Sequence, residues 1–386
     1  MNREDFPVLI GDHRLVYLDS ANTTLKPQCV VAAVNDYYET YSANIGRATY
    51  DLSERATVAY GAARQKVADF IGADSSEVIF THSATYAINQ VAYGLAHTLR
   101  PGDVILLTNY EHNSNILVWQ KIAANTGATV AYLGDDIQLS NVKIFSYTLA
   151  SNVTGEVFNH HALIAKLRKQ GTKIVVDAAQ AVSKLPIDVR RLDCDFLVFS
   201  SHKLYGPSGV GVLYARAELQ PTLEPLVYGS QTFAEISKHE FKLLNGVERF
   251  EPGTPNVEGV IGLGAAVDYL GSIGINKVHE HDQKSVDYIL SQLKHAGLLP
   301  YLVAQPKQQI GVFSLAHPTI HPHDIAMLLN EQHIAVRAGK ACSDILMQQL
   351  GLERGVVRIS FGLYTFKSDV DTFIASYADI IKELGG

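Results

Sequence analysis

Residues 196–203 read FLVFSSHK, and this stretch decides the fold class. The first four residues are apolar and have about the length of a buried strand. Polar residues follow directly, and the last of them is Lys203. A second stretch, residues 173–180 (KIVVDAAQ), has the same form and places Asp177 at the end of an apolar run. Their spacing is typical of successive βα units, so both residues are expected where strands of one sheet end.

The repeat extends over a large part of the chain, from about residue 78 to residue 215. Strands are expected at 78–80, 103–108, 129–133, 142–148, 173–177, 196–200 and 210–215. Helical patterns at 84–99, 115–125 and 159–170 separate several of them. This alternation predicts an α/β fold with a mostly parallel, seven-stranded central sheet flanked by helices.

The pattern changes after the turn-rich residues 251–256 (EPGTPN). A glycine- and alanine-containing helix follows, then expected strands at 311–316, 334–336 and 356–361, and a closing helix capped by Ser368. We predict a large domain over residues 15–275. A smaller α+β domain is expected to combine residues 1–14 with residues 276–386.

Composition excludes several classes of protein. The 386 residues are 47% hydrophobic, enough for two cores, and the formal net charge of −7 offers no basic surface for nucleic acid. The N-terminus lacks the apolar region of a secretory signal, and no apolar run reaches membrane-spanning length. We therefore expect a cytoplasmic protein that binds neither nucleic acid nor membrane. Cys29, Cys194 and Cys342 are scattered singly, which fits neither a disulfide framework nor a zinc site.

Lys203 and Asp177 together indicate pyridoxal 5′-phosphate (PLP) chemistry. A lysine amine can hold an aldehyde cofactor as a Schiff base, and a carboxylate beside the pyridine nitrogen makes the ring an electron sink. Gln180 and Asn152 are candidates to bond the ring oxygen, and His112 to lie against the ring face. The expected phosphate ligands stand at junctions between strands and helices, where helix N-termini favour anions: Thr85, Ser200 and His202.

Each of these residues has an ordinary alternative. Taken singly, residues 200–203 are an ordinary polar loop, Asp177 is a helix N-cap, and His112 is a loop histidine. Their joint occurrence after successive strands favours the cofactor site.

Cys342 lies in residues 336–343 (VRAGKACS), a glycine-containing loop after an expected strand. Its cationic neighbours Arg337 and Lys340 favour a reactive thiolate. The alternative interpretation is that Cys342 is a small buried hydrophobic residue. Cys29 and Cys194 are better interpreted as structural. Arg358 is a candidate to bind a substrate carboxylate, with a surface strand arginine as the alternative.

Two rival motifs are weak. The histidines of residues 317–323 (HPTIHPH) are separated by prolines and lack a nearby acidic or thiol ligand at a known spacing, so no metal site is expected. The glycines of residues 206–211 lead into a strand and not a helix, which disfavours a nicotinamide enzyme.

Over nearly its whole length the chain resembles the fold-type I, class-V aminotransferase-like PLP enzymes, and within them the group II cysteine desulfurases and selenocysteine lyases. The segments that carry the resemblance are residues 111–112, 151–155, 176–181, 200–207, 249–256 and the loop containing Arg337 and Cys342. Two departures stand out. Asn113 follows His112 in place of a second histidine, and Lys340 and Ala341 precede Cys342 in place of paired histidines.

The resemblance implies a mechanism and a set of partners. Lys203 would bind the cofactor and remove the α-proton of L-cysteine, and Cys342 would attack the substrate sulfur to leave L-alanine and a persulfide. Arg358 would hold the substrate carboxylate, with Arg337 and Asn152 beside it, and Thr254 would reach the phosphate from the other subunit of a homodimer. A protein sulfur acceptor is implied, with iron–sulfur cluster assembly as one pathway.

Two alternatives remain open. The same cofactor site would serve a selenocysteine lyase, an aminotransferase or an epimerase of this fold. The altered loops also leave open a non-catalytic homologue that has kept the fold.

Overall fold

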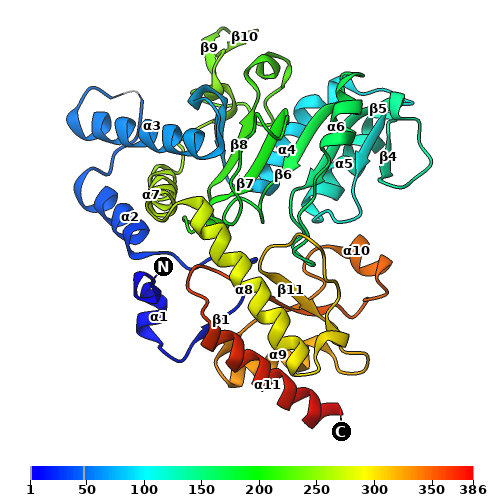
Figure 1. Ribbon diagram of the computed structural model, residues 1–386. Coiled ribbons are helices and arrows are strands. Elements are labelled where there is room, and N and C mark those ends of the chain that lie inside the picture. Colours follow the sequence, from blue (N-terminus) through cyan, green and yellow to red (C-terminus); the bar gives the residue numbers. More distant parts are fainter. Residues whose placement is uncertain (1, 47, 386) are drawn as a thin grey trace.

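A computed structural model describes residues 2–46 and 48–385 (Figure 1). Its central sheet has seven strands in the order β2-β8-β7-β6-β5-β3-β4. The strands are β2 (Val78–Thr81), β3 (Val104–Leu107), β4 (Thr129–Tyr132), β5 (Val142–Thr148), β6 (Lys173–Asp177), β7 (Phe196–Ser200) and β8 (Gly211–Ala215). Neighbours from β4 to β7 are parallel, and only β8 runs antiparallel to its partners within this sheet. The predicted fold class is confirmed.

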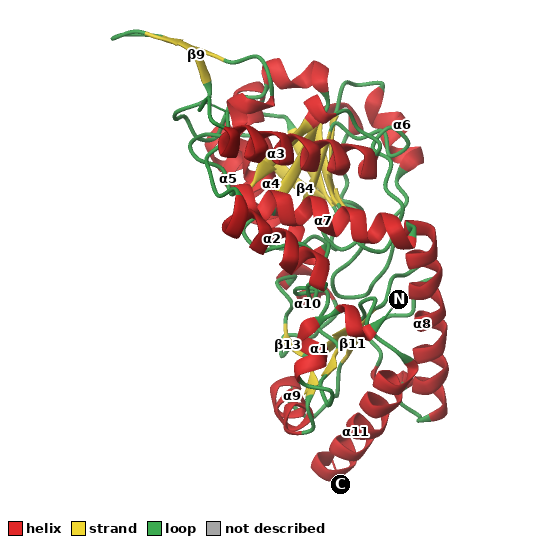
Figure 2. Cartoon of the chain, turned by 90° about the vertical axis from the view of Figure 1, so that its left-hand side faces the viewer, coloured by secondary structure: helices red, strands yellow, loops and turns green. Residues whose placement is uncertain are grey.

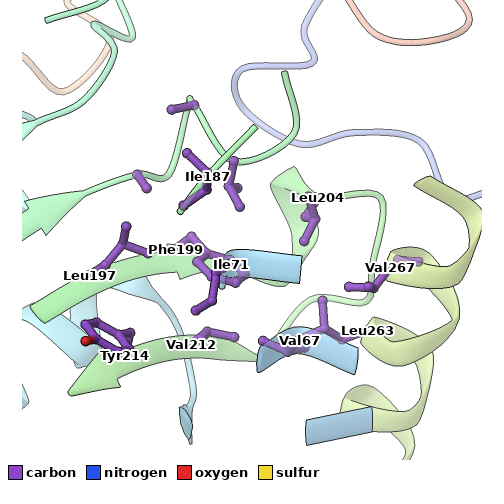
Figure 3. Packing of buried hydrophobic residues seen from close by; sticks show 14 of the residues in the cluster. Val67, Ile71, Ile187, Leu197, Phe199, Leu204, Val212, Tyr214, Leu263 and Val267 are labelled. Atoms are coloured by element: carbon purple, nitrogen blue, oxygen red, sulfur yellow. The ribbon is translucent and has the colours of Figure 1, made fainter. Parts of the chain in front are cut away.

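Helices cover both faces of this sheet, which is why its middle strands are apolar without alternation. On one face lie α2 (Gln28–Thr40), α3 (Asp51–Ile71), α6 (His161–Arg168) and α7 (Val257–Ile273); on the other lie α4 (Ala84–Leu95) and α5 (Ser114–Thr126). Leu197 and Phe199 of β7 pack toward α3 and α7, as Figure 3 shows, whereas Phe196 and Val198 pack toward α4 and α5. The strand is therefore fixed from both sides, and so is the position of Lys203 just after it.

A smaller layer contains three antiparallel strands in the order β11-β14-β13. They are β11 (Val312–Leu315), β14 (Val356–Ser360) and β13 (Arg337–Gly339), with the short α10 (Asp344–Gln349) beyond β13. Residues of α8 (Ile275–His295), α9 (Pro322–Glu331) and α11 (Lys367–Gly385) share one buried cluster with β11 and β14. The long α8 runs from the large part of the molecule along the small one (Figure 1).

The N-terminal segment contacts both parts of the molecule. Phe6 directly precedes α1 (Pro7–Gly11) and Leu9 lies within it. Both join the buried cluster on the face of the central sheet that α2, α3, α6 and α7 cover. Val16 and Leu18 join the small-domain cluster instead, and β1 (Val16–Tyr17) pairs with β12 (Ile334–Ala335). These contacts run across the expected boundary at residues 14 and 15, and the domain division stays a prediction.

Two local features complete the fold. A hairpin of β9 (Phe233–Ile236) and β10 (Phe241–Leu243) projects away from the rest of the chain (Figure 2). The expected cap of the closing helix is wrong: α11 begins at Lys367, so Ser368 lies inside it, and the Asp369 carboxylate accepts the N–H of Phe366 at 2.8 Å. Among the described residues no single helix is long and apolar enough to span a membrane; α7 and α8 pass that test only as a pair bent by 75°.

Candidate functional site

A cavity of about 230 Å³ lies where the parallel strands of the central sheet end. Polar side chains that follow β2, β3, β5, β6 and β7 converge on it, as expected for this type of sheet. Eight residues predicted from the sequence line it: Thr85, His112, Asn152, Asp177, Gln180, Ser200, His202 and Lys203.

Lys203 ends a single 3-10 turn that directly follows β7. The backbone just beyond it is constrained, because Tyr205 has a positive φ of 63° and donates its N–H to Oγ1 of Thr24 at 2.8 Å. Burial lowers the pKa of the Lys203 amine to about 8, although the Asp177 carboxylate acts in the opposite direction. More of this amine is therefore in the neutral form, which attacks an aldehyde, near neutral pH than for an ordinary lysine.

Asp177 is the last residue of β6 and only 5% exposed. Its Oδ1 accepts the N–H of Ala179 at 2.9 Å, so it caps the following turn while it also borders the cavity. Burial raises the pKa of this carboxyl, and the hydrogen bond and the Lys203 charge oppose that rise. A buried carboxylate near a lysine is suited to face a cationic ring nitrogen.

Hydroxyl groups surround the N-terminus of α4 at one end of the cavity. Oγ of Ser83 accepts the N–H of Tyr86, and Oγ of Ser200 accepts the N–H of Ala84 at 2.8 Å. Gly211 permits this approach, because a Cβ there would stand 2.3 Å from the carbonyl carbon of Ser83. Hydroxyl donors at a helix N-terminus form a site for a phosphate group.

Both histidines of the cavity are neutral near pH 7. Burial lowers the pKa of His112 and of His202 to about 4, and the Lys203 charge adds to both effects. Nδ1 of His112 accepts the N–H of Ser114 at 3.2 Å, which leaves the ring proton on Nε2. An uncharged, oriented ring is what stacking on a flat cofactor requires.

A smaller cavity of about 50 Å³ adjoins the first and shares Asn22, His112, Asn152, Gln180 and Lys203 with it. It adds Arg337, Arg358 and Cys342 from the segment that contains β13 and β14. Cys342 is exposed, which contradicts the alternative of a buried structural thiol. The predicted cysteine and arginine thus meet the predicted lysine, which lies more than one hundred residues earlier in the chain.

Arg358 sits in the middle of β14 and is only 4% exposed, so the alternative of a surface arginine is wrong. Its Nη1 donates to the carbonyl oxygen of Asn152 at 3.1 Å, and its Nη2 lies 3.3 Å from Oδ1 of Asp19. Its Nε is buried and has no hydrogen-bond partner among the described residues. Burial lowers the pKa of Arg358, and the Asp19 carboxylate opposes that effect.

Thr254 is not part of either cavity. It lines a separate cavity of about 60 Å³ together with Tyr60, His82 and Phe250. Within one chain it does not meet the expected phosphate ligands, so its contribution from a second subunit stays a prediction.

No site role was predicted from the sequence for several residues that shape the site. Asn22 lines both cavities and donates to Asp19 Oδ2 at 3.0 Å. Glu111 is fully buried behind His112, where it accepts the N–H of Thr148 at 3.0 Å and the amide of Asn115 at 2.6 Å. The polar run of residues 19–24 (DSANTT) is the sequence feature that could have indicated Asn22 and Asp19.

The histidines of residues 317–323 have structural roles. Nδ1 of His317 accepts the N–H of Ile320 at 3.1 Å, and Nδ1 of His321 accepts the N–H of His323 at 3.3 Å as the cap of α9. They lie apart from both cavities, since neither cavity includes them.

Comparison with known proteins agrees with this geometry. The model of the family described as aminotransferase class-V matches residues 16–373. A probable cysteine desulfurase from Streptomyces coelicolor is 38% identical, with 96% of this chain and 94% of the relative covered. This chain belongs to the cysteine desulfurases of the class-V aminotransferase family.

Two further relatives support the assignment. A cysteine desulfurase from Haloferax volcanii is 34% identical over 99% of this chain and 96% of its own length. The apo structure of the cysteine desulfurase from Thermococcus onnurineus superposes with a TM-score of 0.92 at 35% identity, covering 99% and 97% of the two chains. CsdA from Escherichia coli, solved in its S-sulfonic acid form, gives 0.89 at 34% identity and covers 99% and 98%. The family resemblance seen in the sequence is confirmed.

Proposed function

We propose that this chain takes the sulfur of L-cysteine with the help of PLP bound at Lys203, releases L-alanine, and holds the sulfur as a persulfide on Cys342. The observation that carries the proposal is that Lys203, Cys342 and Arg358 border one small cavity. A lysine, a thiol and a carboxylate-binding cation are the three groups that this reaction needs.

The residues of the larger cavity fit PLP. Lys203 offers an amine of lowered pKa to the aldehyde, the buried Asp177 suits the ring nitrogen, and the neutral His112 suits the ring face. The α4 N-terminus with Ser200 and Thr85 suits the phosphate. When bound, PLP supplies an electron sink that stabilises negative charge at the α-carbon of the substrate.

The protein's own groups supply the remaining steps. Arg358 binds the substrate carboxylate, since it borders the smaller cavity and a guanidinium offers paired donors to a carboxylate. Nζ of Lys203 takes the α-proton. The Sγ of Cys342 then forms a bond to the substrate sulfur as the bond between that sulfur and the β-carbon breaks. The β-carbon ends protonated, so L-cysteine and one thiol give L-alanine and one persulfide.

Partners follow from the same chemistry. A persulfide on an exposed loop residue must be passed on, which supports a protein sulfur acceptor. The position of Thr254 outside the site supports a homodimer in which each chain completes the other's site. A cytosolic location and a place in iron–sulfur cluster assembly remain predictions from the sequence.

Incubation of the purified protein with L-cysteine, with and without a reductant, tests the proposal. We expect alanine and sulfide in equal amounts, with turnover that is slow alone and stimulated by reductant. Undiminished alanine formation in Cys342→Ala would count against the persulfide role. Products from other amino acids, especially keto acids or alanine from selenocysteine, separate the other reactions of this fold, and turnover that depends on Lys203 rules out a non-catalytic homologue.

A further inference from the structure

The loop that carries Cys342 is tied to the large domain by two asparagines. Nδ2 of Asn152 donates to the carbonyl oxygen of Ala341 at 2.7 Å, and Oδ1 of Asn152 accepts from the Ser343 hydroxyl at 2.9 Å. On the other side, the backbone N–H of Asn113 donates to the carbonyl oxygen of Cys342 at 2.8 Å.

The Asn113 side chain adds a reciprocal pair of hydrogen bonds at the end of the same loop. Its Nδ2 donates to Oδ2 of Asp344 at 2.8 Å, and its Oδ1 accepts the N–H of Asp344 at 3.2 Å. The first of these bonds lowers the pKa of the Asp344 carboxyl. Because one bond needs a donor and the other an acceptor, an amide fits this place better than a carboxylate.

The loop backbone needs such support. Ala341 and Cys342 both have left-handed φ values, 52° and 56°, which side chains with a Cβ adopt only at an energetic cost. Such conformations persist where surrounding contacts over-determine them. The contacts of Asn113 and Asn152 are among those that hold this loop.

We propose that Asn113 is a positioning residue that locks the Cys342 loop against the cavity through Asp344. It acts through the loop, since it lines neither cavity. Its effect on the rate rests on the proposed function, whereas its effect on the loop does not. The lock sets how often the Cys342 sulfur is in place to meet a substrate held by Arg358.

Three variants separate this role from a general effect on folding. Asn113→Asp sets two carboxylates together and breaks the bond to Asp344. Asp344→Asn alone keeps an acceptor for Asn113, and the exchanged pair Asn113→Asp with Asp344→Asn restores one donor and one acceptor in the opposite sense. Arg14→Ala is the control, because its ion pair with Asp12 at 3.7 Å is exposed and contributes little, and because Arg14 lines neither cavity.

The measurements use the PLP-loaded enzyme. In Asn113→Asp we expect amide hydrogen exchange of the loop peptide around Cys342 to rise about tenfold, as for loss of a charge-assisted hydrogen bond. For the same reason the kcat for alanine formation should fall about tenfold, whereas KM and cofactor absorbance should be unchanged. The exchanged pair should recover most of both losses, and Asp344→Asn and Arg14→Ala should stay near wild type.

Two results would overturn the proposal: wild-type loop exchange in Asn113→Asp, or a loss that the exchanged pair fails to recover. If wild-type enzyme makes no alanine from L-cysteine, the proposed function fails, but the hydrogen-exchange comparison still decides whether the lock exists.

Discussion

Nη2 of Arg358 lies 3.3 Å from Oδ1 of Asp19, which connects the middle of β14 to the N-terminal segment. The same segment is bound along β14, since the N–H of Ser360 donates to the carbonyl oxygen of Leu18 at 2.8 Å and Oγ of Ser360 accepts the N–H of Ala21. The orientation of Arg358, the proposed ligand of the substrate carboxylate, therefore depends on residues near the start of the chain.

Replacement of this arginine tests its role directly. In Arg358→Lys the charge is kept, but the paired donors for a carboxylate and the contact to Asn152 are lost. We expect KM for L-cysteine to rise about 10- to 100-fold, the range for loss of a hydrogen bond to a charged group. Steady-state kinetics measure this, with cofactor absorbance as the control. An unchanged KM would assign carboxylate binding elsewhere.

The lowered pKa of Lys203 predicts how cofactor binding depends on pH. Only the neutral amine attacks an aldehyde, so the rate at which PLP-free protein takes up PLP should rise with pH through about 8. Since Asp177 raises this pKa, Asp177→Asn should move the midpoint to lower pH. Absorbance after mixing with PLP across a pH series provides the measurement, and a midpoint that stays fixed or moves upward in the variant would contradict it.

The buried histidines predict a pH dependence of stability. Burial lowers the pKa of His202 and of His112 from 6.5 to about 4. Between those pH values each of these histidines binds more protons in the unfolded chain than in the folded one, so their contribution to the free energy of unfolding falls as pH drops from about 6.5 toward 4. In His202→Gln this fall should be smaller than in wild type. Urea unfolding at pH 7 and pH 4.5 measures the free energy of unfolding of both proteins. An equal loss of this free energy in both would show that His202 is charged in the folded protein.

Gly211 predicts a steric effect on the phosphate end of the cavity. A Cβ at this position would stand 2.3 Å from the backbone of Ser83, so Gly211→Ala must displace the start of α4. We expect weaker PLP binding and a stability loss of about 1–3 kcal/mol, as for other overpacked sites. Gly271→Ala in α7 is the control, because nothing lies within 4 Å of its added Cβ. PLP titration and thermal unfolding distinguish the two variants; equal PLP affinity in both would show that the close approach to Ser83 is not needed.

The sequence predicted the central sheet closely because its strands are buried on both faces. Such strands appear as continuous apolar runs, and the ends of β6 and β7 fell where Asp177 and Lys203 had been expected. Helix ends that are set by local hydrogen bonds were predicted less accurately, as the misplaced cap at Ser368 shows.

The meeting of distant segments could not be derived from periodicity or spacing. Asp19 with Arg358 and Asn113 with Asp344 are pairs separated by hundreds of residues, and nothing local in either segment indicates its partner. The sequence marked Cys342 and Arg358 as candidates and the family resemblance implied their roles, but neither indicated the residues that hold them. Those residues became evident only from the packing of the small domain on the sheet.

The most direct test of the central claim is the mass of the peptide that contains Cys342 after the PLP-loaded enzyme meets L-cysteine without reductant. The account predicts a gain of one sulfur atom on Cys342, lost on later treatment with reductant and absent in Lys203→Ala. Alanine formation with an unmodified Cys342 peptide, or with the added sulfur on Cys29 or Cys194, would contradict it.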